Sequence, residues 1–442
     1  MQELSPRKRC EPSPRKRARV EPEDGRPKWE VEPDAFVHAR RAIKLRFVDS
    51  AGALSDSFEP EFTHQLFEGE AIACPAAEQP LAIEVIYSPA CALYYRLAND
   101  APMAGAAEAA MYKLAEQLPD SARSLDELRE QARAPFAVDV SGERLSEYTL
   151  PAAAGATYEI YCAELHDGTA ARRAYAERLV STFRWPIETW EGIDMADDRW
   201  RLISLVERGA DGARRVVGGV TVFRFSRWAS GGTQLLLRVC QIGILPPFRS
   251  KGHGGRLLQA VYAYAAAQGA GLVTVEDPNA SFRLLRDLTD ARNCLAKGLL
   301  KPVSTSSTPS AEQMAEARRE LLITDEQCVR CHELQQYRML RAELEAAGAD
   351  DEAATKPFRL MIKRRLNKRH QEELDSVLSI AEQQAAEAAI VAKAGGPKAD
   401  AAAIEATKQE AVTKRKERLG ELYDDLVSEY VEIAGYIVSR RG

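Results

Sequence analysis

The sequence predicts an α/β (α+β) fold with a helical C-terminal part, on three observations. Strand patterns follow one another at 200–208, 216–226 and 235–245. A glycine-rich turn then leads into an amphipathic helix at 253–268 and a further strand at 271–277, a crossover unit. After residue 291 the strand patterns stop, and helical patterns fill 311–347, 356–392 and 402–440. The order of elements therefore indicates a sheet-containing core followed by helices.

Composition narrows the class of protein. The chain has 442 residues, enough for two to four domains, with 45% hydrophobic and 29% charged residues, a balance that excludes a wholly disordered chain. The net charge of −6 argues against a basic nucleic-acid binder. We expect no membrane span, because no run of 18 apolar residues occurs, and no secretory signal. The eight cysteines are then expected to be free thiols in a reducing compartment.

The predicted domains are 1–34, a disordered basic tail; 35–154, a small α/β domain; 155–290, the α/β core that holds the strands above; and 291–442, a helical domain. Within the first 20 residues, seven Lys and Arg oppose two Glu, in two Pro-Arg-Lys-Arg clusters. These clusters predict a nuclear import signal, with a solvated tail as the alternative. In the last helix, Leu426, Tyr430, Ile433 and Ile437 belong to one apolar stripe, which needs a partner helix.

The segment 241–258, QIGILPPFRSKGHGGRLL, predicts an anion-binding loop. Pro246 and Pro247 end the strand because they lack an N–H to donate. The first N–H groups of the following helix have no partners inside it, so they can bind a pyrophosphate. We expect the loop glycines to admit the ligand's close approach, so a side chain at Gly254 should block it. The loop residues predicted to bind such a pyrophosphate-bearing ligand are Arg249, Ser250, Lys251, Gly252, His253, Gly254 and Gly255.

Carboxylates follow the next strand. Glu276 and Asp277 end the segment GLVTVED, where ligands of α/β sheets commonly bind. A carboxylate in this position can act as a general base toward a bound substrate. Glu276 is the first candidate and Asp277 the second. The alternative for both, stronger for Asp277, is a capping role for the helix that begins near Asn279.

The loop spacing Arg-x-x-Gly-x-Gly resembles that of the GNAT acetyltransferases, and several flanking segments resemble the catalytic subunit of the type B histone acetyltransferases. These segments are ILPPFRSKGHGGRLLQ, VEDPNASFRLLRD at 275–287, PEFTHQLF at 60–67, FRWPIETWEGIDMADDRW at 183–200 and FRLMIKRRL at 358–366. The resemblance covers about 36–440. Arg249 departs from the Gln that is common in relatives, and the Ala-rich stretch at 100–150 also differs.

The resemblance implies a mixed, mostly antiparallel sheet and acetyl-CoA as the co-substrate, with no metal. It assigns the base role to Glu276 and places Glu188 near the substrate's lysine amine, although Glu188 also fits an ordinary surface acid. It implies that the strand before the loop splays and exposes the backbone of Ile242, Gly243 and Ile244 to the cofactor. Gly243 fits, since a glycine within a strand often marks a bulge or close approach. Asn279 and Phe282 are implied as further contacts; core packing is the alternative for Phe282.

The resemblance also implies a substrate and partners. The N-terminal tail of free, newly made histone H-4, with its core-histone partner, would lie along Glu68, Gly69 and Glu70 and along Phe223, Arg224 and Phe225. Core packing is the alternative for the two phenylalanines. A WD-repeat propeller subunit that binds histones is the expected partner, with location in nucleus and cytoplasm. Two other functions stay open: acetylation of another protein, and a histone-chaperone scaffold whose site is silent.

Three further patterns favour structural roles. Cys328, Cys331 and His332 spell CxxCH, but no second CxxC completes a zinc site and no export signal supports haem attachment. Cys240 and Cys294 flank the site and offer a covalent route that direct attack does not need. The basic helix at 356–370 fits a solvated face, with docking onto an acidic surface or nucleic acid as the alternative.

Overall fold

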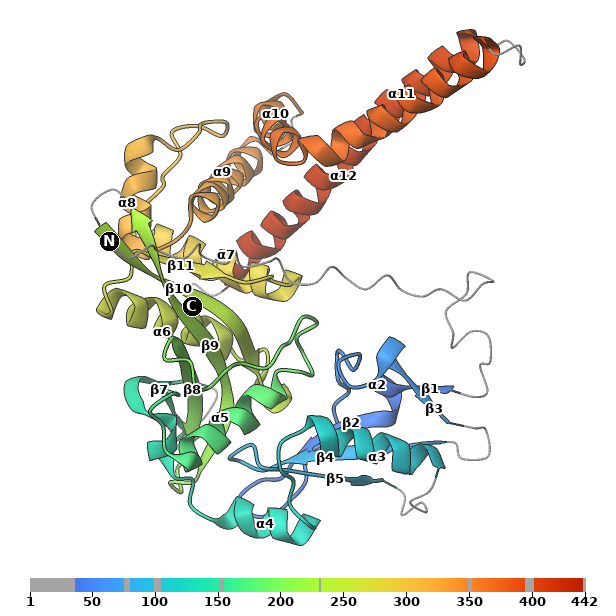
Figure 1. Cartoon of the computed structure of the whole chain (residues 1–442). Helices are drawn as coiled ribbons and strands as arrows, with labels where there is room; N and C mark the ends of the chain where they lie inside the picture. The colour runs from blue at the N-terminus through green and yellow to red at the C-terminus, as the bar shows by residue number, and fades with distance from the viewer. Residues whose placement is uncertain are drawn as a thin grey trace, which may run out of the picture. The chain divides into compact units, whose positions relative to one another are not determined.

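The computed structural model describes residues 36–74, 80–98, 105–151, 155–229, 232–348, 352–393 and 401–439 (Figure 1). The basic tail predicted at 1–34 lies outside these residues. The chain forms two compact units, Met1–Phe136 with Glu177–Gly192, and Ala137–Ala176 with Ile193–Gly442. The division therefore falls at residue 136 rather than at the predicted 154, and residues 177–192 return to the first unit.

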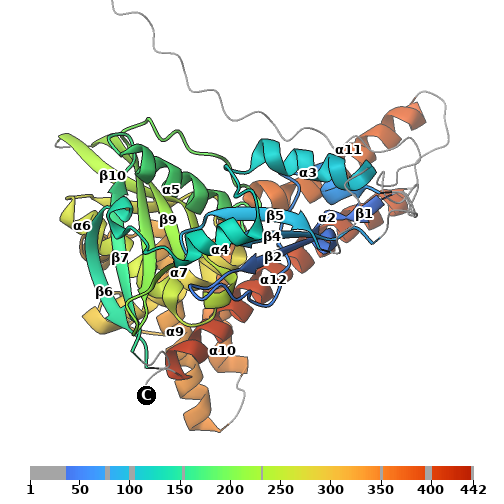
Figure 2. The same ribbon diagram turned by 90° about the horizontal axis from the view of Figure 1, so that it is seen from below.

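A three-stranded sheet organises the first unit (Figure 2). Its order is β2 (Ile43–Phe47), β4 (Ile83–Tyr87), β5 (Leu93–Leu97), with β2 parallel and β5 antiparallel to β4. Residues of β4 alternate between two hydrophobic clusters: Ile83 and Val85 pack with α3 (Gly105–Gln117), and Ile86 packs with α4 (Leu125–Arg133). The two helices therefore cover opposite faces. A short pair, β1 (Phe36–His38) with β3 (Ala71–Ala73), and the helix α2 (Ala39–Ala42) complete it.

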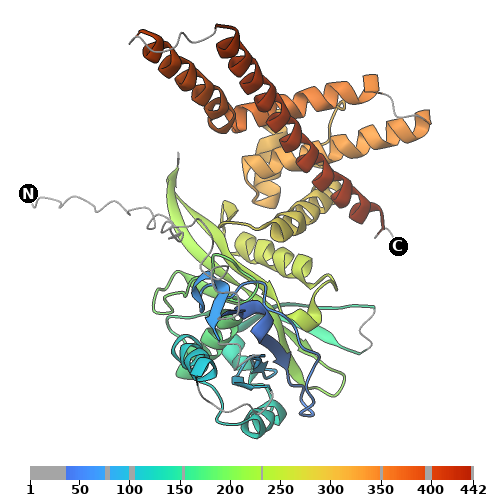
Figure 3. The same cartoon turned by 90° about the vertical axis from the view of Figure 1, so that its right-hand side faces the viewer.

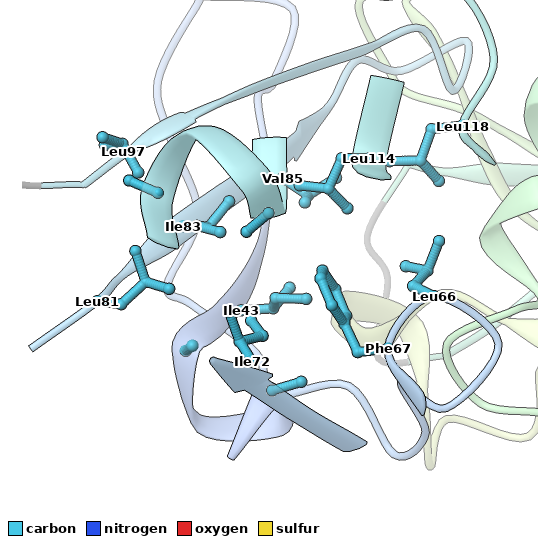
Figure 4. Close-up of a cluster of buried hydrophobic side chains, with 14 of the residues drawn as sticks. Ile43, Leu66, Phe67, Ile72, Leu81, Ile83, Val85, Leu97, Leu114 and Leu118 are labelled. Atoms are coloured by element: carbon cyan, nitrogen blue, oxygen red, sulfur yellow. The ribbon is translucent and has the colours of Figure 1, made fainter. Parts of the chain in front are cut away.

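Trp185 explains why residues 177–192 belong to this unit. Its side chain is 3% exposed and belongs to the hydrophobic cluster of this unit, and its Nε1 donates a hydrogen bond of 2.7 Å to the hydroxyl of Tyr87. Figure 4 shows part of that cluster, including Phe67, Ile83 and Leu114. The predicted helix at 171–190 accordingly ends early: α5 spans Ala170–Thr182. The chain then leaves the helical path, because Trp185 enters the core and Pro186 restricts the residue before it.

A six-stranded mixed sheet forms the second unit's core, in the order β11-β10-β9-β8-β7-β6. The strands are β6 (Glu143–Thr149), β7 (Thr157–Glu164), β8 (Trp200–Arg208), β9 (Arg214–Ala229), β10 (Gly232–Ile244) and β11 (Leu272–Val275). Every pairing is antiparallel except β10 with β11. The helix α6 (His253–Ala267) connects these two parallel strands. The mixed, mostly antiparallel sheet that was expected is confirmed.

Helices make up the rest of the second unit (Figure 3). They are α7 (Ala280–Lys297), α8 (Ala311–Leu321), α9 (Asp325–Ala347), α10 (Glu352–Arg369), α11 (Gln371–Lys393) and α12 (Ala401–Ser439). The predicted stripe of α12 is buried against α7, α9 and α10, so its partner helices lie within the chain. Among the described helices, none has the length and apolar character needed to cross a membrane.

Candidate active site

The strand β10 parts from β11 where the sequence predicted a splay. Their pairing ends at Val239 opposite Val275, and a bulge at Cys240 follows. Beyond it, Ile242, Gly243 and Ile244 pair with β9 alone among the described strands. The bulge expected near Gly243 therefore lies at Cys240. The strands approach closely at the facing residue Gly218 of β9, where an added Cβ would lie 2.2 Å from the Gly243 oxygen.

The loop after β10 turns back on itself. Pro246–Phe248 form a single 3₁₀ turn, and Ser250 and Gly252 then adopt φ values of 60° and 88°. Arg249 donates from Nε to the Ile244 oxygen at 3.0 Å, and Lys251 donates from Nζ to the Pro247 oxygen at 2.8 Å. Arg249 therefore fastens the loop to the end of β10, Lys251 closes the loop on its own 3₁₀ turn, and both residues remain exposed.

The N-terminus of α6 lacks a capping side chain. Helices α4, α7, α8 and α9 begin with Ser124, Asn279, Ser310 and Thr324, each of which accepts a hydrogen bond from the helix's first turn. The N-cap of α6 is Gly252, which provides no side-chain hydrogen bond. The first N–H groups and the positive end of the helix dipole thus remain available for an anion beside Arg249 and Lys251.

The other loop residues have structural roles that the sequence did not predict. The side chain of His253 is 1% exposed; its Nδ1 lies 2.7 Å from the Tyr148 hydroxyl, and its ring lies 4.5 Å from that of Tyr158. Burial, with Lys251 nearby, lowers the pKa of His253, so the imidazole is neutral at neutral pH and adds no positive charge to the loop. A Cβ on Gly254 would meet Leu285 of α7 at 3.0 Å, so this glycine also permits close packing of the two helices, a role that the sequence did not predict.

Glu276 lies at the opening between β10 and β11. Its N–H donates to the Val239 oxygen at 2.9 Å, and its side chain is 52% exposed. Arg238 Nη1 lies 3.6 Å from Oε1 of Glu276. The Cys240 thiol is half-buried beside Glu276, and partial burial together with the interaction with Glu276 raises its pKa. The thiol therefore stays protonated, which removes the basis for a thioester route at Cys240.

The residues after Glu276 serve the start of α7. Asp277 adopts a φ of 37° at the turn, which directs the chain from the strand into the helix. Oδ1 of Asn279 accepts a hydrogen bond of 2.8 Å from the Phe282 N–H. The helix cap is therefore Asn279 itself, so the capping alternative for Glu276 and Asp277 is wrong. Phe282 is 8% exposed, in accord with the core-packing alternative.

Glu188 belongs to the first unit, where the segments 60–67 and 183–190 meet. Trp185 accepts hydrogen bonds from the N–H groups of Glu61 and Phe62 at 3.0 Å. The backbone oxygen of Glu188 accepts from His64 Nε2 at 2.9 Å and from Gln65 Nε2 at 2.8 Å. Two segments that carried the resemblance thus fix the backbone of Glu188, while its side chain stays exposed.

The predicted substrate segment Glu68, Gly69, Glu70 forms one 3₁₀ turn in the same unit. Glu68 is exposed, and Gly69 has a φ of 64°. Oε1 of Glu70 accepts a hydrogen bond of 3.0 Å from the Thr63 N–H. Glu70 therefore stabilises the loop at 63–70 rather than standing as a free acid.

Phe223, Arg224 and Phe225 lie on β9 in the second unit. Phe223 packs edge-on against Trp200 at 4.9 Å, and Phe225 lies beneath the Arg238 guanidinium at 5.0 Å. All three are half-buried. Since Arg238 also approaches Glu276, it connects the predicted substrate strand to the predicted base. Sequence reasoning missed Arg238; its place one register step before the β10–β11 opening was the available signal.

The CxxCH pattern belongs to a hydrophobic core. Cys328 and Cys331 are fully buried with Cys294 between α7, α8 and α9. His332 is 1% exposed, and its Nδ1 hydrogen-bonds the Leu300 oxygen at 3.0 Å. These contacts account for the pattern as packing.

Comparisons with known proteins match two regions. A family described as "Histone acetyl transferase HAT1 N-terminus" matches residues 35–188, and the "Acetyltransferase (GNAT) family" matches residues 172–286. A histone acetyltransferase type B catalytic subunit of Rattus norvegicus is 30% identical over 232 residues, covering 51% of this chain and 52% of the relative. One from Dictyostelium discoideum is 27% identical over 258 residues, covering 56% and 53%.

A solved structure, the xEco2 acetyltransferase domain bound to a K105-CoA conjugate, aligns at 12% identity with a TM-score of 0.25, covering 32% of this chain and 88% of that one. The chain spans about half the length of the curated relatives it matches. With its GNAT sheet, its open helix N-terminus and its match to the N-terminal family, the chain resembles the catalytic subunits of type B histone acetyltransferases.

Proposed function

We propose that this protein transfers the acetyl group of acetyl-CoA to lysine ε-amines in the N-terminal tail of free, newly synthesised histone H-4. The proposal depends on three features that occur together in one unit. The end of β10 pairs with β9 alone, the N-terminus of α6 has no capping side chain, and Glu276 lies at the opening between β10 and β11. The resemblance to type B catalytic subunits supports the choice of substrate.

The residues present fit acetyl-CoA. The N–H groups at the start of α6 would bind its pyrophosphate, with Arg249 and Lys251 adding positive charge. The backbone of Ile242 and Gly243, which pairs with one strand only, would hydrogen-bond the amides of its pantetheine arm. Bound in this way, acetyl-CoA supplies an activated acyl carbon.

Glu276 would then remove the proton that prevents attack. A lysine ammonium with a pKa near 10.4 is almost wholly charged at neutral pH, so its Nζ has no free electron pair. The Glu276 carboxylate would take this proton, directly or through water, and Nζ would form the new bond to the acyl carbon. As the carbon–sulfur bond breaks, the departing CoA thiolate would take up the second proton that Nζ loses on becoming an amide nitrogen. Arg238, 3.6 Å from Oε1, orients the carboxylate.

The wider role proposed is histone deposition, together with a WD-repeat propeller that holds the histone, in both nucleus and cytoplasm. These parts rest on the resemblance alone. Acetylation of a different protein is the competing possibility, and the substrate experiment separates the two.

The purified protein is incubated with radiolabelled acetyl-CoA and either free core histones, assembled nucleosomes or unrelated basic peptides. We expect label in histone H-4 among the free histones and little in nucleosomes. Equal rates of labelling on the unrelated peptides would indicate that the natural substrate is another protein. If calorimetry detects no binding of acetyl-CoA, the alternative function, a histone-chaperone scaffold with an inactive site, would be favoured.

A further inference from the structure

A cavity of about 710 Å³ lies among the C-terminal helices, and none of the residues proposed for acetyl transfer lines it. Its walls are the loop at 306–309, α9, α10 and Met314 of α8. The volume falls within the range of ligand-binding sites. Val329, Leu360 and Met361 make much of the lining apolar, and Leu360 is 41% exposed.

Two cations on the cavity rim have no acidic partner in the described part of the chain. Arg364 and Lys368 lie one turn apart on α10, and both side chains are exposed. Other arginines of α10 are paired: Arg359 with Glu352, Arg365 with Glu333, and Arg369 with Glu326. The positive charge of the rim is therefore not neutralised by the protein's own carboxylates.

A buried acceptor also lines the cavity. Gln336 is fully buried, and its Nε2 donates to the Ser304 and Ser307 oxygens at 3.0 and 2.7 Å, which fixes the amide. Its Oε1 has no hydrogen-bond partner among the described residues. A buried oxygen without a donor costs free energy, and a ligand that brings an N–H or O–H would remove that cost.

We propose that this cavity binds a short acidic peptide segment of a partner protein that carries a large apolar side chain. The apolar side chain fills the space over Leu360 and Met361, and carboxylates pair with Arg364 and Lys368. A backbone or side-chain N–H supplies the donor that Gln336 lacks. An apolar anchor between acidic residues meets all three requirements, whereas a basic histone tail would be repelled by the rim.

The test is fluorescence anisotropy of the full chain with labelled twelve-residue peptides. The acidic probes contain glutamates around a central Leu, Phe or Trp. One matched probe has Ser at the centre, and another has Lys in place of each Glu. We expect the acidic, apolar-centred probes to bind best and to weaken as salt rises, because exposed charges are screened.

Matched protein variants place the binding at the cavity. Arg364→Glu with Lys368→Glu should weaken the acidic probe by about tenfold or more, since two attractions become repulsions. Leu360→Ser should weaken binding of the acidic probe by a similar factor at low and at high salt, because the contact that it removes is apolar. Lys356→Glu, a similar charge change on the same helix away from the cavity lining, is the control and should have little effect. Melting temperature and acetyl transfer to free histones should be unchanged in the rim variant, since neither cation forms an ion pair within the described residues.

The proposal is overturned if none of the acidic probes binds, or if the Lys-substituted probe binds as well. It is also overturned if Lys356→Glu weakens binding as much as the rim double variant. None of these results bears on acetyl transfer, which is measured separately in the same samples.

Discussion

Glu276 owes its surroundings to two residues of the neighbouring strand, on either side of Val239. Arg238 faces it with a guanidinium at 3.6 Å, and Cys240 contributes a protonated thiol from the bulge. The bulge adds a residue to β10 at the point where β11 ends, so it changes which side chains reach the opening. The chemistry at Glu276 thus depends on an irregularity of the strand as much as on the carboxylate itself.

Replacing Cys240 with Ala tests whether the thiol acts as a nucleophile. Since burial and Glu276 both raise the pKa of the thiol, we expect kcat to fall by no more than about fivefold, the effect of losing one hydrogen bond of about 1 kcal/mol. Steady-state kinetics with free histones measures it. A loss of several orders of magnitude, with a labelled acetyl-enzyme in the wild type, would favour the covalent route instead.

Asp290 is a buried acid that should make stability depend on pH. It is fully buried; Tyr262 donates a hydrogen bond of 3.1 Å to it, and Arg286 Nε lies 3.6 Å away. Burial raises its pKa to about 7, against the opposing effect of Arg286. The folded state therefore binds a proton that the unfolded chain has lost, and stability falls as pH rises from about 4 to about 7.

Asp290→Asn should remove this dependence, because the amide does not titrate. Between pH 4.5 and 7.5, the wild-type melting temperature should fall by at least about 2 °C more than that of the variant. Thermal melts monitored by circular dichroism measure the difference. Parallel pH profiles of the two proteins would mean that Asp290 titrates normally.

At the scale of elements, the contact between α6 and α7 decides what the loop glycines do. Gly254 faces Leu285, whereas a Cβ on Gly255 would lie 3.7 Å from Thr289, an ordinary contact. The close packing of these helices sets the direction in which the first turn of α6 points. The glycines therefore act on the proposed cofactor site through helix position.

Gly254→Val should reduce stability by about 1–3 kcal/mol, because the larger side chain overpacks the contact with Leu285. Combining it with Leu285→Ala should restore part of the loss, and Gly255→Ala is the mild control. Urea unfolding measures these differences. A variant with normal stability and a greatly raised KM for acetyl-CoA would favour direct approach of the ligand to Gly254 instead.

Strong local patterns made most elements predictable, and tertiary contacts decided the rest. The strands β8, β9 and β10 and the helix α6 follow from alternation and from the apolar face at Leu257, Leu258 and Val261. Strand β6 gave little pattern because it is an edge strand that is largely exposed. The early end of α5 depends on the burial of Trp185 in another sheet's core.

In the candidate site, too, the residues with local sequence signals were predictable and those with long-range contacts were not. Motifs located Glu276 and the loop because their chemistry is local to a few consecutive residues. The role of His253 depends on Tyr148, 105 residues away, and that of Gly254 depends on Leu285, about 30 residues away. Such contacts leave no trace in the residues of the loop itself.

At the scale of the molecule, α7 belongs to two cores at once. It follows β11 after the turn at 276–279; its Ala291 packs in the cluster formed with α9, α10 and α12, and its Cys294 packs in a second cluster with residues of α8 and α9. The helices predicted as a domain at 291–442 therefore lie in the same compact unit as the sheet. Figure 1 shows α12 running alongside α11 and on toward α7.

Deleting residues 401–442 should destabilise this whole unit. Leu426, Tyr430, Ile433 and Ile437 are buried, and each contributes about 1.5–3 kcal/mol, a total comparable to the stability of a typical domain. We expect the shortened protein to aggregate or to melt far below the full chain in gel filtration and calorimetry. A soluble monomer with unchanged kcat/KM would establish a separable helical domain.

The most direct test of the proposed mechanism is the pH dependence of kcat for Glu276→Gln, with acetyl-CoA affinity measured alongside. Glutamine keeps the size of the side chain but cannot accept the proton. At pH 7 kcat should fall by about 10²–10⁴-fold while acetyl-CoA affinity stays unchanged, and the defect should shrink as pH rises toward the amine pKa near 10.4. A variant with near-wild-type kcat at pH 7 and an unaltered pH profile would contradict the assignment of Glu276 as the base.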